Sequence, residues 1–480
     1  MVADIAYMQD QQHSINRMHD LFAQQRAAFR AAPMPDADSR IRQLGELKAA
    51  LIKHQEALIA AINADFGRRS ADETRLAEIL PSLEGIKYAC KHIRRWMKPS
   101  KRKVGVAFQP GKAQVIYQPL GVVGIIVPWN YPLFLAIGPL VTAIAAGNRA
   151  LIKMSESTPE TAELLGRVLA EVFHENQVAV VTGEAEVGVA FSQMAFDHLL
   201  FTGATSIGRH VMRAAADNLT PVTLELGGKS PAIISADVPL ADAAERIAFG
   251  KAMNAGQTCV APDYILCPRE RVDGLVEALN TQLSKMYPTL RNNPDYTQVV
   301  NPRQYLRLQG YLRDAEEKGA RLLPINPANE DLSGTRILPP TLVLDTSDEM
   351  TLMQDEIFGP LLPIVPYDSL NEALDYIADR PRPLALYYFG YDKAEQQRMM
   401  EQTHAGGMCI NDTIFHVAQD DMPFGGIGPS GMGHYHGHEG FLALSKAKGV
   451  YIKQRFNGSR PIYPPYGGKL LNMVYKLFIR

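Results

Sequence analysis

The stretch "GVVGIIVPWNYPLFLAIGPLVTAIAAGN", residues 121–148, contains no charged residue and is long enough to cross a bilayer. Proline, glycine and asparagine residues interrupt its apolar runs. They divide it into a short strand "GVVGIIV", a turn "PWNYP" and a helix "LVTAIAAG". A strand and a helix inside an α/β core need no charges, so the pattern favours a buried β–turn–α unit over a membrane span.

Short strand-like runs alternate with helical segments beyond this unit. The strand-like runs are "RALIKMS", "VAVVTG", "HLLFTG" and "PVTLELGG". One intervening helix is predicted to begin at Pro159, with Thr158 as its N-cap. Strands that alternate with helices predict a mostly parallel sheet with right-handed crossovers. A similar series follows Gly227, so we expect two α/β lobes.

Composition places the chain among ordinary globular proteins. The 480 residues are 46% hydrophobic and 21% charged, and the length predicts two or three domains. The net charge of −2 gives no general attraction to nucleic acid or to an anionic membrane, and the basic run at residues 91–103 is interpreted as a solvated face. Four scattered cysteines and the lack of a secretory pattern in "MVADIAYMQDQQHS" predict a cytoplasmic protein.

Polar and glycine residues follow several predicted strands, at the carboxyl ends where ligands gather in open α/β sheets. They are Asn130, Lys153, Glu156, Gly203, Gly208 and Glu225. This clustering predicts a pocket. The turn "GATSIG" is not a GxGxxG fingerprint. Taken alone, it is equally a tight turn that needs glycine or a helix N-terminus offered to a pyrophosphate.

Cys259 stands among small and polar residues in "NAGQTCVAP", residues 254–262. An isolated cysteine is more often a buried, inert thiol than a reactive one. The alternative is a nucleophile held between backbone amides that favour its thiolate. The spacing of this segment alone does not decide between them.

Seven motifs together resemble the NAD(P)-dependent aldehyde dehydrogenase superfamily. In chain order they are "PWNYP", "IKMSESTP", "FTGATSIG", "LELGGKSP", "GQTCVAPDY", "EIFGP" and "MPFGG", and they span most of the chain. The short N-terminal arm and the segment "GMGHYHG" resemble the class 3 branch, and bacterial coniferyl aldehyde dehydrogenases in particular.

The resemblance implies a role for each matching side chain. Cys259 would attack the aldehyde carbon, and Asn130 with the backbone N–H of Cys259 would form the oxyanion hole. Glu225 would activate the water that hydrolyses the resulting thioester. The other three cysteines, Cys90, Cys267 and Cys409, would be structural.

The resemblance also implies a cofactor site. Lys153 and Glu156 would hold the hydroxyls of the adenosine ribose, which favours NAD, although class 3 relatives with this glutamate also accept NADP. Glu356 and Phe358 would position the nicotinamide ribose and ring. The remaining residues along the cofactor path would be Trp129, Gly203, Ala204, Thr205 and Gly208, and many relatives have serine where this chain has Ala204.

We expect three parts: a Rossmann-like NAD-binding domain (residues 1–103 and 119–226), an α/β catalytic domain (227–414) and a small β bridging element (104–118 and 415–480). Strands that leave the body this way predict a homodimer. The substrate is expected to be an aromatic or medium-chain aldehyde in an apolar tunnel lined by Tyr131 and Phe424.

Other functions remain to be weighed. An enzyme that transfers the acyl group to coenzyme A would be expected to lack Glu225. A non-catalytic binding protein on the same fold would be expected to lack Cys259 or Asn130. All three residues are present. The alternating His434, His436 and His438 could place imidazoles on one side of a strand to bind zinc. Because supporting ligands cannot be identified, no metal is expected.

Overall fold

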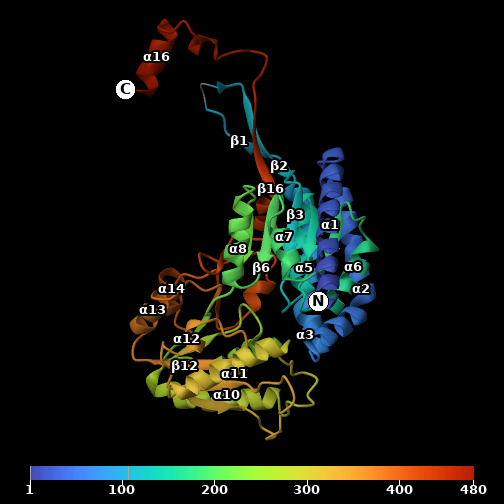
Figure 1. The fold of residues 1–480 in the computed structure, drawn as a ribbon. Coiled ribbons are helices and arrows are strands. Elements are labelled where there is room, and N and C mark those ends of the chain that lie inside the picture. The colour runs from blue at the N-terminus through green and yellow to red at the C-terminus, as the bar shows by residue number, and fades with distance from the viewer. Residues whose placement is uncertain (1, 106–107, 480) are drawn as a thin grey trace.

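The computed structural model describes residues 2–105 and 108–479. Residues 1, 106, 107 and 480, which fall within the predicted NAD-binding and bridging ranges, lie outside the described residues. Mixed α/β architecture with two mainly parallel sheets confirms the predicted fold class (Figure 1).

The first sheet contains six strands in the order β15-β7-β6-β3-β4-β5. Five are parallel and run consecutively along the chain: β3 (Val122–Ile126), β4 (Arg149–Lys153), β5 (Val178–Val181), β6 (His198–Thr202) and β7 (Val222–Glu225). The short β15 (Gly431–Met432) pairs antiparallel with β7 at the edge. The strand order reverses between β3 and β6, which is the switch point where ligands bind in sheets of this kind.

Helices surround this sheet. They are α1 (Val2–Ala31), α2 (Ala37–Phe66), α4 (Leu80–Trp96), α5 (Phe134–Ala146), α6 (Pro159–Ala170), α7 (Ala185–Ser192) and α8 (Thr205–Ala216). The short α3 (Ala71–Thr74) and the π-helical turn η1 (Arg75–Ile79) lead into α4. The charge-free stretch thus forms β3 and α5, as its pattern predicts.

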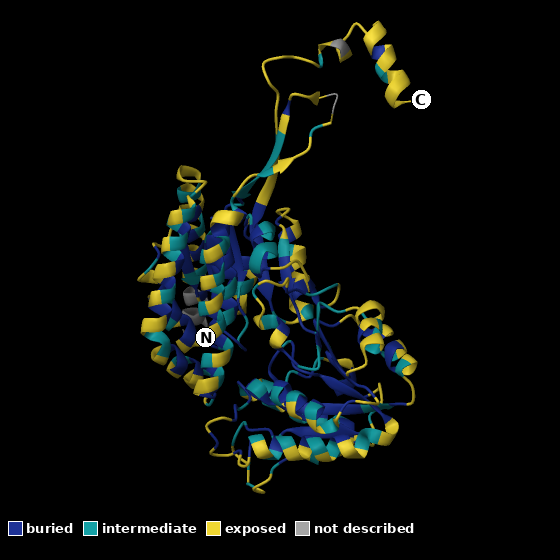
Figure 2. Cartoon of the chain, turned by 180° about the vertical axis from the view of Figure 1, so that it is seen from behind, coloured by how far each residue is buried: buried dark blue, intermediate teal, exposed yellow. Residues whose placement is uncertain are grey.

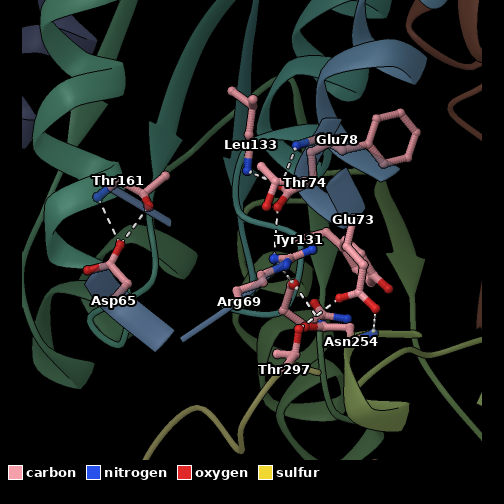
Figure 3. Close-up of polar contacts among 12 residues, drawn as sticks. Asp65, Arg69, Glu73, Thr74, Glu78, Tyr131, Leu133, Thr161, Asn254 and Thr297 are labelled. Atoms are coloured by element: carbon pink, nitrogen blue, oxygen red, sulfur yellow. Dashed lines mark hydrogen bonds and ion pairs between the residues drawn. The ribbon is translucent and has the colours of Figure 1, made fainter. Parts of the chain in front are cut away.

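Helix α6 begins at Pro159 as predicted, but its cap differs from the prediction. Thr158 occupies the N-cap position without a side-chain capping bond to any described residue. Asp65, at the end of α2, instead accepts hydrogen bonds from the N–H groups of Glu160 (3.0 Å) and Thr161 (2.9 Å). Figure 3 shows the contact with Thr161. A tertiary contact therefore replaces the local cap.

The second sheet contains seven strands in the order β10-β11-β12-β9-β8-β13-β14. These are β8 (Pro231–Ile234), β9 (Tyr264–Pro268), β10 (Arg321–Pro324), β11 (Thr341–Leu344), β12 (Leu361–Tyr367), β13 (Ala385–Phe389) and β14 (Gly407–Ile410). Only β10 is antiparallel among the described pairings of this sheet. Its helices are α9 (Leu240–Ala252), α10 (Val272–Met286), α11 (Pro302–Glu317), α12 (Thr351–Gln354), α13 (Leu370–Ala378) and α14 (Lys393–Gln402).

Both sheets share one apolar core. Buried side chains of β3, β4 and α5 belong to the same cluster as those of β8, β9 and β13. Every residue of β6, β8, β9 and β13 is buried, as expected for strands covered on both faces. The lobes are thus packed against each other around the site.

A three-stranded antiparallel arm extends from the body. It contains β1 (Ser100–Arg102), β2 (Lys112–Pro119) and β16 (Ser445–Ile452), and the tail beyond it ends in α16 (Lys469–Phe478) (Figure 1). The arm and tail are largely exposed, in contrast to the body (Figure 2). Two details differ from the predicted ranges: β1 lies within the range assigned to the NAD-binding domain, and β15 lies within the range assigned to the bridge but pairs with β7.

The glycine-rich segment at residues 422–440 includes β15 and the start of α15 (Gly437–Ala443). The remaining short helices are η3 (Met253–Gly256), η4 (Arg269–Arg271), η5 (Phe415–Ala418) and η6 (Arg460–Ile462). None of the described helices combines the length and apolar character needed to cross a membrane.

Candidate active site

Cys259 lies in a turn between α9 and β9 whose backbone is held in an uncommon conformation. Asn254 and Ala255 both have φ of 51°, and Gly256 has φ of 70°. Left-handed conformations are costly for residues other than glycine and persist where the surroundings fix them. A Cβ at Gly256 would lie 2.3 Å from the carbonyl oxygen of Gly359. The second lobe therefore requires glycine here, three residues before the cysteine.

Amide side chains join this turn to the loop after β3. The Nδ2 of Asn254 donates to the carbonyl oxygens of Asn130 and Gln257, at 3.1 Å each. The Nδ2 of Asn130 donates to the carbonyl oxygen of Gln257, at 3.2 Å. An amide has two N–H groups, and the second one of Asn130 donates to no described protein atom. It is therefore available to a ligand oxygen beside Cys259.

A buried ion pair supports Asn130 from the other side (Figure 3). The Nη1 of Arg69 lies 2.8 Å from Glu78 Oε1 and donates to the carbonyl oxygen of Asn130 at 2.9 Å. Its guanidinium lies over the ring of Tyr131, 4.8 Å from the centroid. Glu78 Oε2 accepts hydrogen bonds from the N–H groups of Leu133 (2.7 Å) and Phe134 (3.1 Å) at the start of α5. The pair therefore fixes both ends of the turn that contains Asn130.

Sequence reasoning missed this pair. The segment "RRSADETRLAEI" has the charge density of a solvated helix surface. The π-helical turn η1 changes the helical phase there and places Glu78 in the interior. Burial raises the pKa of the Glu78 carboxyl, while the charge of Arg69 opposes this.

Glu225 is buried at the carboxyl end of β7, where its backbone carbonyl accepts a hydrogen bond from the N–H of Gly203 (3.0 Å). Neither carboxylate oxygen has a hydrogen-bond partner within residues 2–105 and 108–479. Burial raises the pKa of this carboxyl well above its ordinary value. Because the pKa of this buried carboxyl is raised, its ionised form is a strong base toward any water that reaches it.

Cys259 is half-buried. It lies near enough to Glu225 for the charge of that carboxylate to affect the pKa of its thiol. Burial raises the pKa of its thiol to about 12, and the charges of Glu356 and Glu225 act in the same direction. Backbone N–H groups of Cys259 and Val260 lower this pKa, as the sequence suggested, but burial outweighs them. The resting group is therefore a thiol, and its reaction requires a proton acceptor.

The predicted adenosine-binding residues lie at the carboxyl end of β4: Lys153 is its last residue, and Glu156 follows three residues later. The buried Lys153 donates through Nζ to the carbonyl oxygen of Met154 (2.8 Å), and its Nζ lies 4.0 Å from Glu156 Oε2. The side chain of Glu156 is 45% exposed. Burial lowers the pKa of Lys153, with Glu156 acting in the opposite direction. Only Glu156 of this pair reaches solvent, while the Lys153 ammonium lies buried behind it.

Helix α8 begins at the carboxyl end of β6, in the same parallel sheet as β4. Ala204 is its exposed N-cap residue, and no described side chain caps the helix. Thr205 donates through Oγ1 to the carbonyl oxygen of Pro429 (3.1 Å). Close packing explains the two glycines: a Cβ at Gly208 would lie 2.6 Å from Leu226 Cδ2, and one at Gly203 would lie 2.6 Å from the ring of Phe201.

The second lobe contributes the loop that contains Glu356 and Phe358. Lys229 makes an ion pair with Asp263, and Asp263 accepts a hydrogen bond from the N–H of Ile357 at 2.9 Å. Phe358 packs edge-on against Trp129 of the first lobe, with ring centroids 5.3 Å apart. Burial raises the pKa of Glu356 to about 8, and its Oε1 has no partner among the described atoms.

These features fit a dinucleotide. An uncapped helix N-terminus binds phosphate, and unpaired carboxylate oxygens accept hydrogen bonds from ribose hydroxyls. The structure offers the first at α8 and the second at Glu356, and Glu156 adds a half-exposed carboxylate.

The three alternating histidines do not share a face. His434 is exposed, His436 is buried with its ring stacked on Phe424 (5.2 Å), and His438 stacks on Trp96 (5.9 Å). Across the described part of the chain, no group of three or more His, Cys, Asp or Glu could hold a metal ion. Tyr131 contacts the turn that contains Cys259 through a hydrogen bond between its hydroxyl and Thr258 Oγ1 (2.7 Å).

Comparison with known proteins identifies the family. The model of the aldehyde dehydrogenase family matches residues 5–450. The chain belongs to the aldehyde dehydrogenase family. It is an enzyme of the class that oxidises aldehydes to acids, which confirms the resemblance of its motifs.

Two curated relatives are especially similar. A "Probable coniferyl aldehyde dehydrogenase" of Pseudomonas aeruginosa is 65% identical over all 480 residues, covering 100% of both chains. A "Coniferyl aldehyde dehydrogenase" of a Pseudomonas species is 47% identical over 431 residues, 89% of each chain.

Two solved structures have the same fold. A substrate-bound Staphylococcus aureus AldH superposes with a TM-score of 0.90 at 38% identity, covering 96% of this chain and 99% of that one. A Mycobacterium tuberculosis aldehyde dehydrogenase in complex with NAD+ gives 0.82 at 32% identity, over 91% and 90%.

Proposed function

We propose that this aldehyde dehydrogenase oxidises a hydroxycinnamaldehyde such as coniferyl aldehyde to the acid, with NAD or NADP as acceptor, through a covalent intermediate on Cys259. The observation that supports this most directly is the convergence of three groups from both lobes: a thiol, a free amide N–H of Asn130 and the unpartnered carboxylate of Glu225. The names of the two Pseudomonas relatives support the substrate class.

In the first step Cys259 loses its proton to solvent, and the resulting thiolate sulfur attacks the aldehyde carbon. The carbonyl oxygen becomes an oxyanion as the C–S bond forms. Asn130 Nδ2 and the backbone N–H of Cys259 are the donors proposed to stabilise that charge. One such donor commonly lowers a barrier by about 3 kcal/mol. The hydrogen-bonded frame around Asn130 keeps its amide oriented before the substrate arrives.

When bound, the nicotinamide cofactor supplies the acceptor for the hydride that leaves the aldehyde carbon. We propose that Lys153 and Glu156 hold its adenosine ribose, and that Glu356 and Phe358, with Trp129, position its nicotinamide end. Gly203, Ala204, Thr205 and Gly208 would lie beside its phosphates. Because Glu156 accepts hydrogen bonds and repels a 2′-phosphate, NAD is preferred over NADP.

In the last step Glu225 removes a proton from water, which attacks the thioester and releases the carboxylic acid. The buried position that raises the pKa of Glu225 also makes its ionised form a stronger base. Hydrolysis is favoured over transfer to coenzyme A because this base faces the nucleophile. The other three cysteines keep structural roles.

We also propose the assembly and its location. The proposed NAD-binding domain comprises residues 2–99 and 119–226 together with the strand β15. The proposed catalytic domain comprises residues 227–414, and the arm and tail form the bridge. The outer edge of β16 and the exposed apolar residues of α16, Leu470, Met473, Leu477 and Phe478, suit a second copy of the chain. A free catalytic thiol suits the reducing cytoplasm.

The decisive experiment follows NADH formation by purified enzyme with coniferaldehyde, octanal and acetaldehyde, using NAD and NADP in turn. We expect coniferaldehyde with NAD to give the highest kcat/KM. The Cys259→Ala variant should lose activity by on the order of 10⁴ or more while it still binds NAD. Undiminished turnover by that variant, or no NADH with any aldehyde, would reject the proposal.

A further inference from the structure

A carboxylate from the first lobe holds the turn that contains Cys259 (Figure 3). Glu73, in α3, accepts a hydrogen bond through Oε1 from the backbone N–H of Asn254 at 3.1 Å. Its Oε2 accepts a second one from the hydroxyl of Thr297 at 2.8 Å. Asn254 and Thr297 belong to the second lobe, so both oxygens of this carboxylate bond across the boundary between the lobes.

The N–H group that bonds to Glu73 belongs to a residue in a costly conformation. Asn254 has φ of 51° and ψ of 30°, and Ala255 repeats this geometry with φ of 51° and ψ of 37°. Residues other than glycine stay in the left-handed region only where their surroundings hold them there. Asn254 is fully buried, so bulk water does not replace the carboxylate as an acceptor. Glu73 therefore stabilises the turn at a strained residue.

Asn254 connects this carboxylate to the proposed oxyanion donor. Its Nδ2 donates to the carbonyl oxygens of Asn130 and Gln257, and the Nδ2 of Asn130 donates to the same Gln257 oxygen. The Gln257 side chain fixes the turn from within, since its Nε2 donates to the carbonyl oxygen of Asn254 at 2.9 Å. Gln257 precedes Cys259 by two residues. A displacement of Asn254 would therefore change the position of the Asn130 amide relative to Cys259.

Glu73 makes its two hydrogen bonds with neutral donors. Burial raises the pKa of its carboxyl, and the charge of Arg69 acts in the opposite direction, but Arg69 forms its ion pair with Glu78. The two bonds therefore depend on the reach of the side chain more than on its charge. A glutamine has the same reach, and it can accept from the N–H of Asn254 while it donates to the hydroxyl oxygen of Thr297. An aspartate keeps the charge but is one methylene shorter.

We propose that Glu73 is a positioning residue for the reaction: by holding Asn254 across the boundary between the lobes, it sets the place of the Asn130 amide relative to Cys259. This rests on the roles of Asn130 and Cys259 in the proposed function. Glu73 acts on the reacting atoms only through the turn. Because a transition state depends on the orientation of its donors, loss of this contact lowers kcat and leaves the affinity for NAD unchanged.

Steady-state kinetics with coniferaldehyde and NAD test this with three variants at one position. Glu73→Ala and Glu73→Asp should each lower kcat by about 10–100-fold, because misplaced reacting groups react more slowly, with KM for NAD within about twofold. Glu73→Gln, which keeps both contacts, should retain kcat within about threefold of the unmodified enzyme. A role of the negative charge would give the reverse order, with the aspartate variant faster than the glutamine variant.

The matched control is Asp65→Ala. Asp65 also accepts hydrogen bonds from backbone N–H groups and from a threonine hydroxyl, but at the start of α6. This variant should lower the midpoint of thermal unfolding and leave kcat at saturating NAD within about twofold. An equal loss of kcat in the control would overturn the inference, because the effect of Glu73 would then be one of general stability.

Unchanged kcat in Glu73→Ala and Glu73→Asp would also overturn the inference, and it would leave the proposed function intact. If Glu73→Ala does not fold, the order of the aspartate and glutamine variants decides. Undiminished turnover by Cys259→Ala would instead reject the proposed function on which the inference rests.

Discussion

The two halves of the active site are built differently. Around Cys259 and Asn130, hydrogen bonds and an ion pair from η3, from Arg69 before α3, from η1 and from the loop after β3 form a mostly buried frame. The cofactor half has an exposed Glu156 and Ala204, and Lys153 bonds to a neighbouring carbonyl. The frame of the first half is formed within the chain and leaves unpartnered polar atoms at Asn130 and Glu225, whereas the second half is open to solvent at Glu156 and Ala204.

The difference indicates where each half obtains its precision. Electrostatic stabilisation of a transition state requires donors that are oriented in advance, because reorientation during reaction costs free energy. A cofactor that binds and leaves in every cycle instead needs an accessible surface. Substitutions in the buried half should therefore have larger effects than those in the open half.

The largest effect that leaves the nucleophile in place is expected for Glu225→Gln. Loss of a general base commonly lowers turnover by about 10²–10⁴-fold. Because the base acts on the thioester, a rapid burst of NADH equal to one per active site should survive, followed by slow steady-state release. Stopped-flow fluorescence measures both phases. A burst that disappears together with turnover would assign Glu225 to the first step instead.

The buried ion pair provides the next test. Arg69→Met leaves Glu78 in the interior without its partner, and removal of one member of such a pair commonly costs about 3–5 kcal/mol. Denaturant unfolding should show this loss in the free energy of unfolding. The control is Arg17→Met, whose partner Glu175 is exposed and where the change should stay within about 1 kcal/mol. A similar loss of unfolding free energy in both variants would contradict the stabilising role of the buried Arg69–Glu78 pair.

The raised pKa of Cys259 predicts the pH dependence of its alkylation. Thiolate is the reactive form, and a pKa of about 12 keeps the thiolate fraction far from saturation up to pH 10. The rate of labelling by iodoacetamide in the enzyme without cofactor should rise about tenfold per pH unit. Mass spectrometry of the peptide that contains Cys259 gives this rate. A plateau near pH 8.5 would mean that the thiol is not desolvated.

The smallest effect belongs to the open half. Glu156→Gln removes the charge that repels a 2′-phosphate, and a charge-assisted hydrogen bond at an exposed site is worth about tenfold in affinity. We expect the ratio of KM for NADP to KM for NAD to fall by that factor with kcat unchanged. Glu160→Gln, four residues along on the exposed start of α6, is the matched control. A fall of this KM ratio in Glu160→Gln but not in Glu156→Gln would show that the adenosine ribose does not bind at Glu156.

The sequence predicted the secondary structure and the family better than the long-range contacts that support the site. Strand and helix runs such as those of β3, α5 and β4 are visible because apolar periodicity is a local property. Motif order predicted the family, which the comparison confirms, and the joint role of Asn130, Glu225 and Cys259, which stays a prediction. The frame that positions Asn130 was missed, since Arg69 and Glu78 look like surface charges until a π-helical turn buries one of them. Contacts between distant segments, like Asp65 on α6, have no local signal.

The position of β15 and β16 in the chain has a consequence for biosynthesis. The five parallel strands of the first sheet emerge together from the ribosome, but β7 gains its outer neighbour β15 and β2 gains β16 only when the last segment has been made. Until then both strands expose hydrogen-bonding edges, which invite pairing with other nascent chains. Such long-range pairing is slow to form. Yield in the cell should therefore depend on chaperones that shield these edges during the closing stage of translation.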